Sequence, residues 1–165
     1  MKKIVVVYML FSLFSCTQKY SLSGEKTKRY TNISSASKSK NKVEVLDLGY
    51  KNLKIVPNEI FQFRDLQVLI LSRNTLRIVP KDVFNLDQLK VLNIGFNHLD
   101  SISPDIGRLQ KLEELYIMGN NIKSLPESLW EIESLRKVVL YGNDLDSEKL
   151  EAIDKRLPNC RIHFY

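Results

Sequence analysis

The feature that most constrains this chain is a repeat of fixed length that begins at Val43. Five consecutive segments of equal length align without a gap: VEVLDLGYKNLKIVPNEIFQFRD, LQVLILSRNTLRIVPKDVFNLDQ, LKVLNIGFNHLDSISPDIGRLQK, LEELYIMGNNIKSLPESLWEIES and LRKVVLYGNDLDSEKLEAIDKRL. After the first, they begin at Leu66, Leu89, Leu112 and Leu135. Self-similarity at a period of this size predicts a solenoid, in which each repeat packs against its neighbours. The fold therefore depends on what one repeat can form and on how it stacks.

Within each repeat, apolar residues alternate with other residues and then give way to a turn. In the third repeat, Leu89, Leu92 and Ile94 should point inward from a short strand, because side chains of a strand alternate between its faces. One repeat cannot cover its own apolar side, so stacked repeats must bury one another's aliphatic residues. Equivalent residues then form two columns, Leu46, Leu69, Leu92, Leu115 and Val138, and Leu48, Leu71, Ile94, Ile117 and Leu140.

A proline opens the second part of the first four repeats. It stands at Pro57, Pro80 and Pro126 in three of them, and one position later at Pro104 in the third repeat. Proline cannot continue a strand interior but fits the start of a helical turn. We therefore expect short helical or irregular turns on the convex side, opposite the strands.

Four asparagines, at Asn74, Asn97, Asn120 and Asn143, recur once in each of the last four repeats, always at the same position. Such a column could be a polar binding site, but a structural role is favoured. Where the backbone turns out of a strand, its amides and carbonyls lose their partners, and one buried asparagine can serve both kinds of group. The first repeat has Lys51 at this position, which predicts an irregular end repeat whose edge is covered by upstream residues such as Tyr30 and Ile33.

The pattern LxxLxLxxNxL is met at every fixed position by LKVLNIGFNHL and LEELYIMGNNI. In this the chain resembles the leucine-rich repeat family. The resemblance implies an α/β solenoid, a segment of a horseshoe with a parallel concave sheet. It also implies a module that binds other molecules rather than an enzyme.

The end of the chain departs from the repeat and predicts a cap. Ser147 can cap a helix whose apolar stripe is Leu150, Ile153 and Leu157. Cys160 then fits the second leucine position of a sixth, closing strand, where it would be a small buried hydrophobic residue. The alternative is a reactive or regulatory thiol. The helix and the strand together would cover the apolar end of the solenoid.

The beginning of the chain is typical of a secreted protein. Lys2 and Lys3 precede an apolar run over residues 4–14, which is too short to cross a membrane as a helix and fits a signal peptide over residues 1–15. The residues around Cys16, LFSC, resemble the bacterial lipobox. That resemblance implies a lipid on Cys16, as in bacterial leucine-rich repeat lipoproteins; the alternative is an ordinary signal peptide with a chance cysteine.

Charge separates residues 16–42 from the repeats. The net charge of the chain is +6, and residues 17–42 alone contribute +6, since they contain seven basic residues and one acidic residue. This Ser/Lys-rich segment predicts a solvated tether between the lipid and the repeat domain at 43–165, or one that rests on anionic lipid headgroups. The repeat domain is slightly acidic, which argues against nucleic-acid binding.

The lipobox resemblance places the protein in a bacterial cell envelope, lipid-anchored. Thr17 follows the cysteine where some inner-membrane lipoproteins have an acidic residue, which favours the outer membrane and leaves surface exposure open. A monomer is expected. A structural envelope component without a specific ligand is the alternative function.

Binding residues are expected at the outward strand positions. Aromatic, methionine and arginine side chains are enriched at protein interfaces, and the alternative is that a strand tolerates such residues on its solvent face. The candidates for contact with a protein or peptide are Tyr50, Ile70, Arg73, Phe96, Tyr116, Met118, Val139 and Tyr141. Asp47, Asn93, His163 and Phe164 are further outward residues.

The sequence predicts neither catalysis nor a bound cofactor. His98 and His163 have no second histidine or cysteine at metal-ligand spacing, and there is no glycine-rich phosphate loop. We therefore expect no catalytic residue, no metal and no cofactor. An enzyme with an unrecognised site is the remoter alternative.

Overall fold

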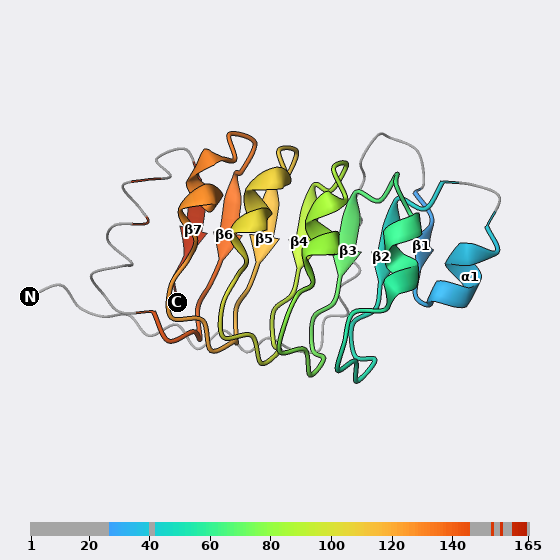
Figure 1. Ribbon diagram of the computed structural model, residues 1–165, viewed down its shortest axis with the longest axis horizontal. Helices are drawn as coiled ribbons and strands as arrows, with labels where there is room; N and C mark the ends of the chain where they lie inside the picture. The colour runs from blue at the N-terminus through green and yellow to red at the C-terminus, as the bar shows by residue number, and fades with distance from the viewer. Residues whose placement is uncertain (1–26, 40–41, 146–152, 154–155, 157–159, 165) are drawn as a thin grey trace, which may run out of the picture.

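The computed structural model describes residues 27–39, 42–145, 153, 156 and 160–164, and its strands form one parallel sheet. The strands are β1 (Arg29–Tyr30), β2 (Val45–Asp47), β3 (Val68–Ile70), β4 (Val91–Asn93), β5 (Glu114–Tyr116), β6 (Lys137–Val139) and β7 (Arg161–His163). They follow one another in space as in the sequence, so they stand in a single row in Figure 1. The sheet is open, and the solenoid predicted from the repeat is confirmed.

Strand pairing follows the repeat period through the middle of the sheet. Leu46 pairs with Leu69, and Leu69 in turn pairs with Leu92. The offset between these partners equals the length of one repeat, so the predicted aliphatic columns are formed by strand register. The end strands depart from this period, with Tyr30 opposite Leu46 on β2 and Ile162 opposite Val138 on β6.

The convex side carries one short 3-10 helix for each of the first four repeats. These helices are η1 (Asn58–Gln62), η2 (Lys81–Asn85), η3 (Pro104–Arg108) and η4 (Glu127–Glu131). Pro57, Pro80 and Pro126 immediately precede three of them, with the φ angle from −64° to −71° that proline imposes. In the third repeat Ser103 takes the preceding position, and its hydroxyl accepts a hydrogen bond from the Asp105 amide at 3.2 Å. The predicted helical turns are confirmed.

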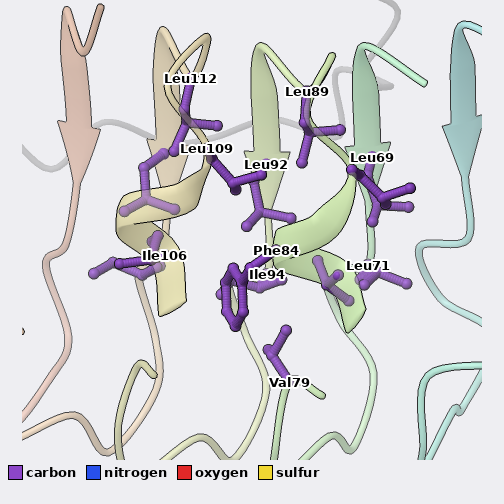
Figure 2. Close-up of a cluster of buried hydrophobic side chains, with 14 of the residues drawn as sticks. Leu69, Leu71, Val79, Phe84, Leu89, Leu92, Ile94, Ile106, Leu109 and Leu112 are labelled. Atoms are coloured by element: carbon purple, nitrogen blue, oxygen red, sulfur yellow. The ribbon is translucent and has the colours of Figure 1, made fainter. Parts of the chain in front are cut away.

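The main core lies between the sheet and these helices. Figure 2 shows its aliphatic side chains between the strands and the helical turns, with the Phe84 ring among them. The column residues Leu69, Leu92 and Leu115 are completely buried, as are Leu71 and Ile94 of the second column. One layer of apolar side chains thus runs from repeat to repeat, which is the stacking that a single repeat requires.

A folded cap covers the N-terminal edge of the sheet. It consists of β1 and the helix α1 (Ile33–Ser37), whose first turn is capped by the Asn32 side chain through the Ser35 amide at 2.8 Å. Tyr30 and Ala36 are buried, and Ile33 packs against the same core. The prediction that Tyr30 and Ile33 shield the first repeat is therefore confirmed.

The solvated tether predicted over residues 16–42 is wrong for residues 27–39. The composition of the whole segment is polar, but Tyr30, Ile33 and Ala36 supply the few apolar side chains that the open edge of the first repeat needs. The short strand β1 is enough to continue the ladder. Residues 16–26 and 40–41 lie outside the described part of the chain, as do the signal peptide at 1–15 and the proposed lipid site Cys16.

The closing strand is present, but its register differs from the prediction. Ile162, and not Cys160, lies opposite Val138 in the first aliphatic column. Cys160 precedes the strand and is half-buried, although it packs against the core. The leucine pattern counted from Leu157 places Cys160 opposite Val138, two positions before Ile162, which strand pairing puts there.

The predicted C-terminal helix falls largely on residues outside the described ranges, including Ser147, Leu150 and Leu157. Ile153 is described, and its side chain is buried in the core as expected. Among the described residues, no helix is long and apolar enough to cross a membrane.

Candidate functional site on the concave face

The concave face is the side of the sheet opposite the four 3-10 helices. Each of the strands β2 to β6 buries its middle side chain in the main core, and Ile162 of β7 packs against that core while partly buried. The first and third side chains of each strand point to the other face, as the alternation of a strand requires. The concave face therefore has two columns of outward side chains, Val45, Val68, Val91, Glu114, Lys137 and Arg161, and Asp47, Ile70, Asn93, Tyr116, Val139 and His163.

The outward side chains of β2 to β4 form a small apolar cluster of their own. Val45, Val68, Ile70 and Val91 are buried together, and Tyr116 packs against them. Ile70 therefore lies on the predicted face but exposes only 3% of its surface. Neighbouring strands are about 4.8 Å apart, so branched side chains at equivalent positions cover one another.

The outward side chains of β5 and β6 are mainly polar and bonded to one another. The Tyr116 hydroxyl donates to the Glu114 carboxylate and accepts from the Lys137 ammonium at 2.9 Å. The same ammonium lies 4.8 Å from the centroid of the Tyr116 ring. Val139 follows on β6 but exposes only 7% of its surface, so this half of the face offers polar groups and an aromatic ring.

Two polar residues of the concave face hold their own backbone turns. The Asp47 carboxylate accepts from the Gly49 amide at 2.8 Å, and the equivalent Asn93 side chain accepts from the Gly95 amide at 3.1 Å. Asp47 also forms an ion pair with Arg29 of β1. These side chains are therefore engaged within the fold.

The turns after β2 to β6 each have a left-handed backbone at one shared repeat position, and the first turn has a second such residue at Asn52. In the first three repeats the residue at the shared position is Tyr50, Arg73 or Phe96, with φ of 58°, 56° and 54°. In the next two it is Gly119 or Gly142, with φ of 64° and 67°. All five occupy the same repeat position. A bulky side chain in this conformation is strained, whereas glycine is not.

The three bulky turn residues stack on one another at the edge of the concave face. The Arg73 guanidinium carbon lies 5.2 Å from the Tyr50 ring centroid and 4.4 Å from the Phe96 ring centroid. Tyr50 exposes 75% of its surface. The Phe96 ring in turn covers Gly119, because a Cβ atom built there would stand 2.5 Å from its Cδ1. We call Tyr50, Arg73 and Phe96 the turn stack.

The asparagine column fixes the turns that carry this stack. The Asn74 side-chain oxygen accepts from the amides of Lys51 and Leu53, both at 3.0 Å, and its nitrogen donates to the Leu48 and Leu71 carbonyls. Asn97, Asn120 and Asn143 repeat this arrangement, each bonded to the preceding turn and to its own. The predicted structural role of the column is confirmed.

Two further predicted binding residues are half-buried in the turns. Met118 lies over Gly95, since a Cβ atom there would stand 2.7 Å from its sulfur, and Tyr141 occupies the equivalent position one repeat later. The structure thus brings Tyr50, Arg73 and Phe96 together and leaves Tyr116 in a separate polar group. The sequence reasoning missed Glu114 and Lys137, although both stand at outward strand positions.

Within the described ranges, the groups considered for metal binding or covalent chemistry are His98, His163 and Cys160. No cluster of histidine, cysteine or carboxylate side chains that could hold a metal occurs among the described residues. His98 is exposed, and the His163 Nε2 atom is buried without a hydrogen-bond partner. Burial raises the pKa of the Cys160 thiol, against the opposing effects of Arg136 and the Val138 backbone. A raised pKa favours the protonated thiol over the nucleophilic thiolate.

Solved structures of other proteins show where this architecture recurs. A leucine-rich repeat protein of Leptospira interrogans is 33% identical over 74% of this chain, with a TM-score of 0.71, and the match covers 32% of that protein. An internalin C2 of Listeria monocytogenes is 24% identical over 74% of this chain, and the match covers 52% of the internalin. Its TM-score of 0.60 shows that the two proteins share a fold.

A plant peptide hormone receptor, solved in complex with RGF2, is 34% identical over 55% of this chain, and the match covers 15% of that receptor with a TM-score of 0.51. The chain therefore spans about half or less of these proteins. No curated protein matches the chain. The family described as leucine rich repeat matches residues 41–99 and 87–145, and these include the asparagine column and all three residues of the turn stack. The chain belongs to the leucine-rich repeat family.

Proposed function

We propose that this chain is a non-enzymatic binding module whose concave face and turn stack hold a protein or peptide. Leucine-rich repeat proteins generally mediate protein–protein interactions, and the plant receptor was solved with its bound partner. The observation that carries the proposal is the turn stack, in which an exposed tyrosine and a phenylalanine hold an arginine between them. These residue types dominate the energetics of protein interfaces.

The size of the sheet limits the partner. Seven strands at a spacing of about 4.8 Å span roughly 29 Å, and three residues at about 3.3 Å span roughly 10 Å. The resulting area, roughly 290 Å², is well below the about 800 Å² that each partner contributes to a standard interface. The ligand is therefore an extended peptide or a protruding loop, and the turns beside the sheet contribute to its contact surface.

The proposed setting is a bacterial cell envelope, with the domain lipid-anchored through Cys16. This rests on the sequence around that cysteine, since residues 1–26 lie outside the described ranges. Growth with an alkyne-tagged fatty acid should label the parent protein and leave a Cys16→Ser variant unlabelled. Equal labelling of both proteins would refute the anchor. Fractionation of the labelled cells would then separate inner from outer membrane.

Binding through the concave face can be tested by affinity capture from envelope and host extracts. The full chain serves as one bait, and a Phe96→Ala/Tyr116→Ala/Tyr141→Ala variant serves as the other. A matched control, Lys81→Ala/Glu131→Ala, changes exposed residues of the convex helices η2 and η4. Circular dichroism should first establish that all baits are folded.

We expect the parent and the convex control to recover the same proteins and the triple variant to lose them. Recovery of identical proteins with all three baits would reject the concave face as the binding surface. It would support the structural envelope component instead, because that role needs no specific ligand on the sheet.

A further inference from the structure

We infer that the turn stack is a receptor for a single carboxylate, so that the ligand of this module presents an aspartate or glutamate side chain to Arg73. This deepens the proposed function and rests on it, because it specifies the chemistry of the same peptide-binding surface.

The Arg73 guanidinium lies close to the aromatic rings of the repeats before and after its own. The guanidinium lies within cation–π distance of the Tyr50 ring on one side and the Phe96 ring on the other, at 5.2 and 4.4 Å. A planar group placed between two rings keeps its N–H donors directed outward in its own plane. Those donors form a fork that matches the two oxygens of a carboxylate.

The Arg73 side chain has no acidic partner within the described part of the chain. Other arginines do: Arg29 pairs with Asp47, Arg156 with Glu127, and Arg108 with Asp105 at 3.1 Å. The contacts of the Arg73 guanidinium in the same part of the chain are the two rings. Its hydrogen-bonding edge is therefore available to a ligand.

The backbone of the stack points to a function beyond turn formation. Equivalent turns are made by Gly119 and Gly142 without strain, yet three consecutive repeats place a bulky residue in the left-handed region. Sparsely populated backbone conformations cost of order 1–3 kcal/mol each and concentrate at ligand-binding sites. In this turn position the left-handed backbone accompanies the contact of the Arg73 guanidinium with the Tyr50 and Phe96 rings.

The number of charges selects a carboxylate over a phosphate. Phosphate groups carry a charge of about −1.5 to −2 and are typically bound by clusters of arginines. The turn stack contains one cation, held by two neutral rings. One guanidinium matches the single charge of an acidic side chain, and the rings can pack against the methylene groups that carry it.

The test begins with random peptides displayed on phage and selected on the immobilised full chain. We expect the selected peptides to share an acidic residue. One such peptide is then labelled, and its affinity is measured by fluorescence anisotropy for the parent, Arg73→Gln, Arg73→Lys and Arg77→Gln. Arg77 is the matched control, because it is an exposed arginine of the same repeat that takes no part in the stack.

Hydrogen bonds to charged groups are worth enough that Arg73→Gln should weaken binding by about tenfold or more. Arg73→Lys should also weaken it, because a lysine keeps the charge and loses the fork. Arg77→Gln should bind like the parent. Replacing the acidic residue of the peptide by its amide should weaken binding to the parent and have little further effect on the residual binding of Arg73→Gln, and circular dichroism should show that this variant is folded.

Three results would overturn the inference, and they differ from a failure of the proposed function. Selected peptides without a shared acidic residue, or equal affinities for the parent and Arg73→Gln, would reject the carboxylate while leaving a peptide-binding surface. Competition by inorganic phosphate but not by acetate would assign the stack to a phosphate group instead. Selection of no peptide at all, or of peptides that bind the triple concave-face variant equally well, would reject the proposed function itself.

Discussion

The N-terminal and C-terminal parts of the solenoid share one core but present different surfaces. In the first three repeats, the outward strand positions hold a buried apolar cluster, and the turns hold Tyr50, Arg73 and Phe96. In the next two, the strands carry the bonded group of Glu114, Tyr116 and Lys137, and the turns carry glycine. The inward columns fix the fold in both parts, so the outward positions can differ without changing it.

The largest expected effect tests the shared core. Leu69→Ala in the N-terminal part and Leu115→Ala in the C-terminal part should each lower the free energy of unfolding by about 2–5 kcal/mol, since both side chains are completely buried in the same column. Urea denaturation followed by circular dichroism measures both. A cost that is large for one variant and negligible for the other would contradict a continuous core.

The asparagine column should give the next largest effect, graded by burial. Asn120→Ala removes a buried side chain that serves an amide of the preceding turn and two carbonyls, and it should cost about 1–3 kcal/mol. Asn143→Ala makes the same change at a half-buried position and should cost less. The same denaturation experiment compares them. A larger loss of unfolding free energy for Asn143→Ala would show that burial does not determine how much each asparagine of the column stabilises the fold.

The turns of the two parts should respond differently to substitution: a side chain added at a glycine turn should destabilise the fold, whereas removal of one from the turn stack should have a small effect. Gly119→Ala adds a Cβ atom at φ +64°, where the Phe96 ring already lies, and should destabilise the fold by about 1–2 kcal/mol. Tyr50→Gly removes backbone strain but also one ring contact of Arg73, so its net effect should stay below about 1 kcal/mol. Thermal unfolding of both variants provides the measurement. A neutral Gly119→Ala variant would refute the close approach of the ring.

The smallest expected effect concerns Cys160 at the C-terminal end. Because burial raises the pKa of this thiol, the thiol stays protonated to a higher pH in the folded protein than in the unfolded chain. Its contribution to stability is therefore unchanged below the pKa of the unfolded chain and falls as the pH rises from that value through the pKa of the folded protein. In a Cys16→Ser background, a thiol reagent at mildly alkaline pH should modify the folded protein more slowly than the urea-unfolded protein. Equal rates would indicate an accessible thiol.

The parts of the structure that the sequence predicts are those repeated at constant spacing. The columns through Leu92 and Ile94, the convex turns after proline and the role of Asn97 all follow from one constant repeat length. All three predictions were confirmed, because repeats with the same pattern of apolar residues can bury those residues only by stacking in register. The same period places Tyr50 and Arg73 in one column, but their ring contact depends on left-handed turns that the leucine pattern does not specify.

The ends of the solenoid were harder to predict, since they have a neighbour on one side only. At the start, Tyr30 and Ile33 were expected to shield the edge, but a very short strand in a polar segment gives no periodic signal. At the end, the strand pairs two positions later than the leucine pattern predicts, so Ile162 takes the place in the column that was expected for Cys160. Outward residues such as Ile70 and Val139 were expected to be exposed, and the close spacing of neighbouring strands buries them instead.

The asparagine column gives the solenoid a direction. Each amide side chain bonds the turn of the repeat before it, so the geometry around Tyr50 depends on Asn74, that around Arg73 on Asn97, and that around Phe96 on Asn120. Shortening the chain from its C-terminal end would release the last remaining turn, whereas loss of the first repeat would leave every later turn held. Gain or loss of a repeat can therefore alter the turn geometry of the repeat before it, while the side chains of that turn stay the same.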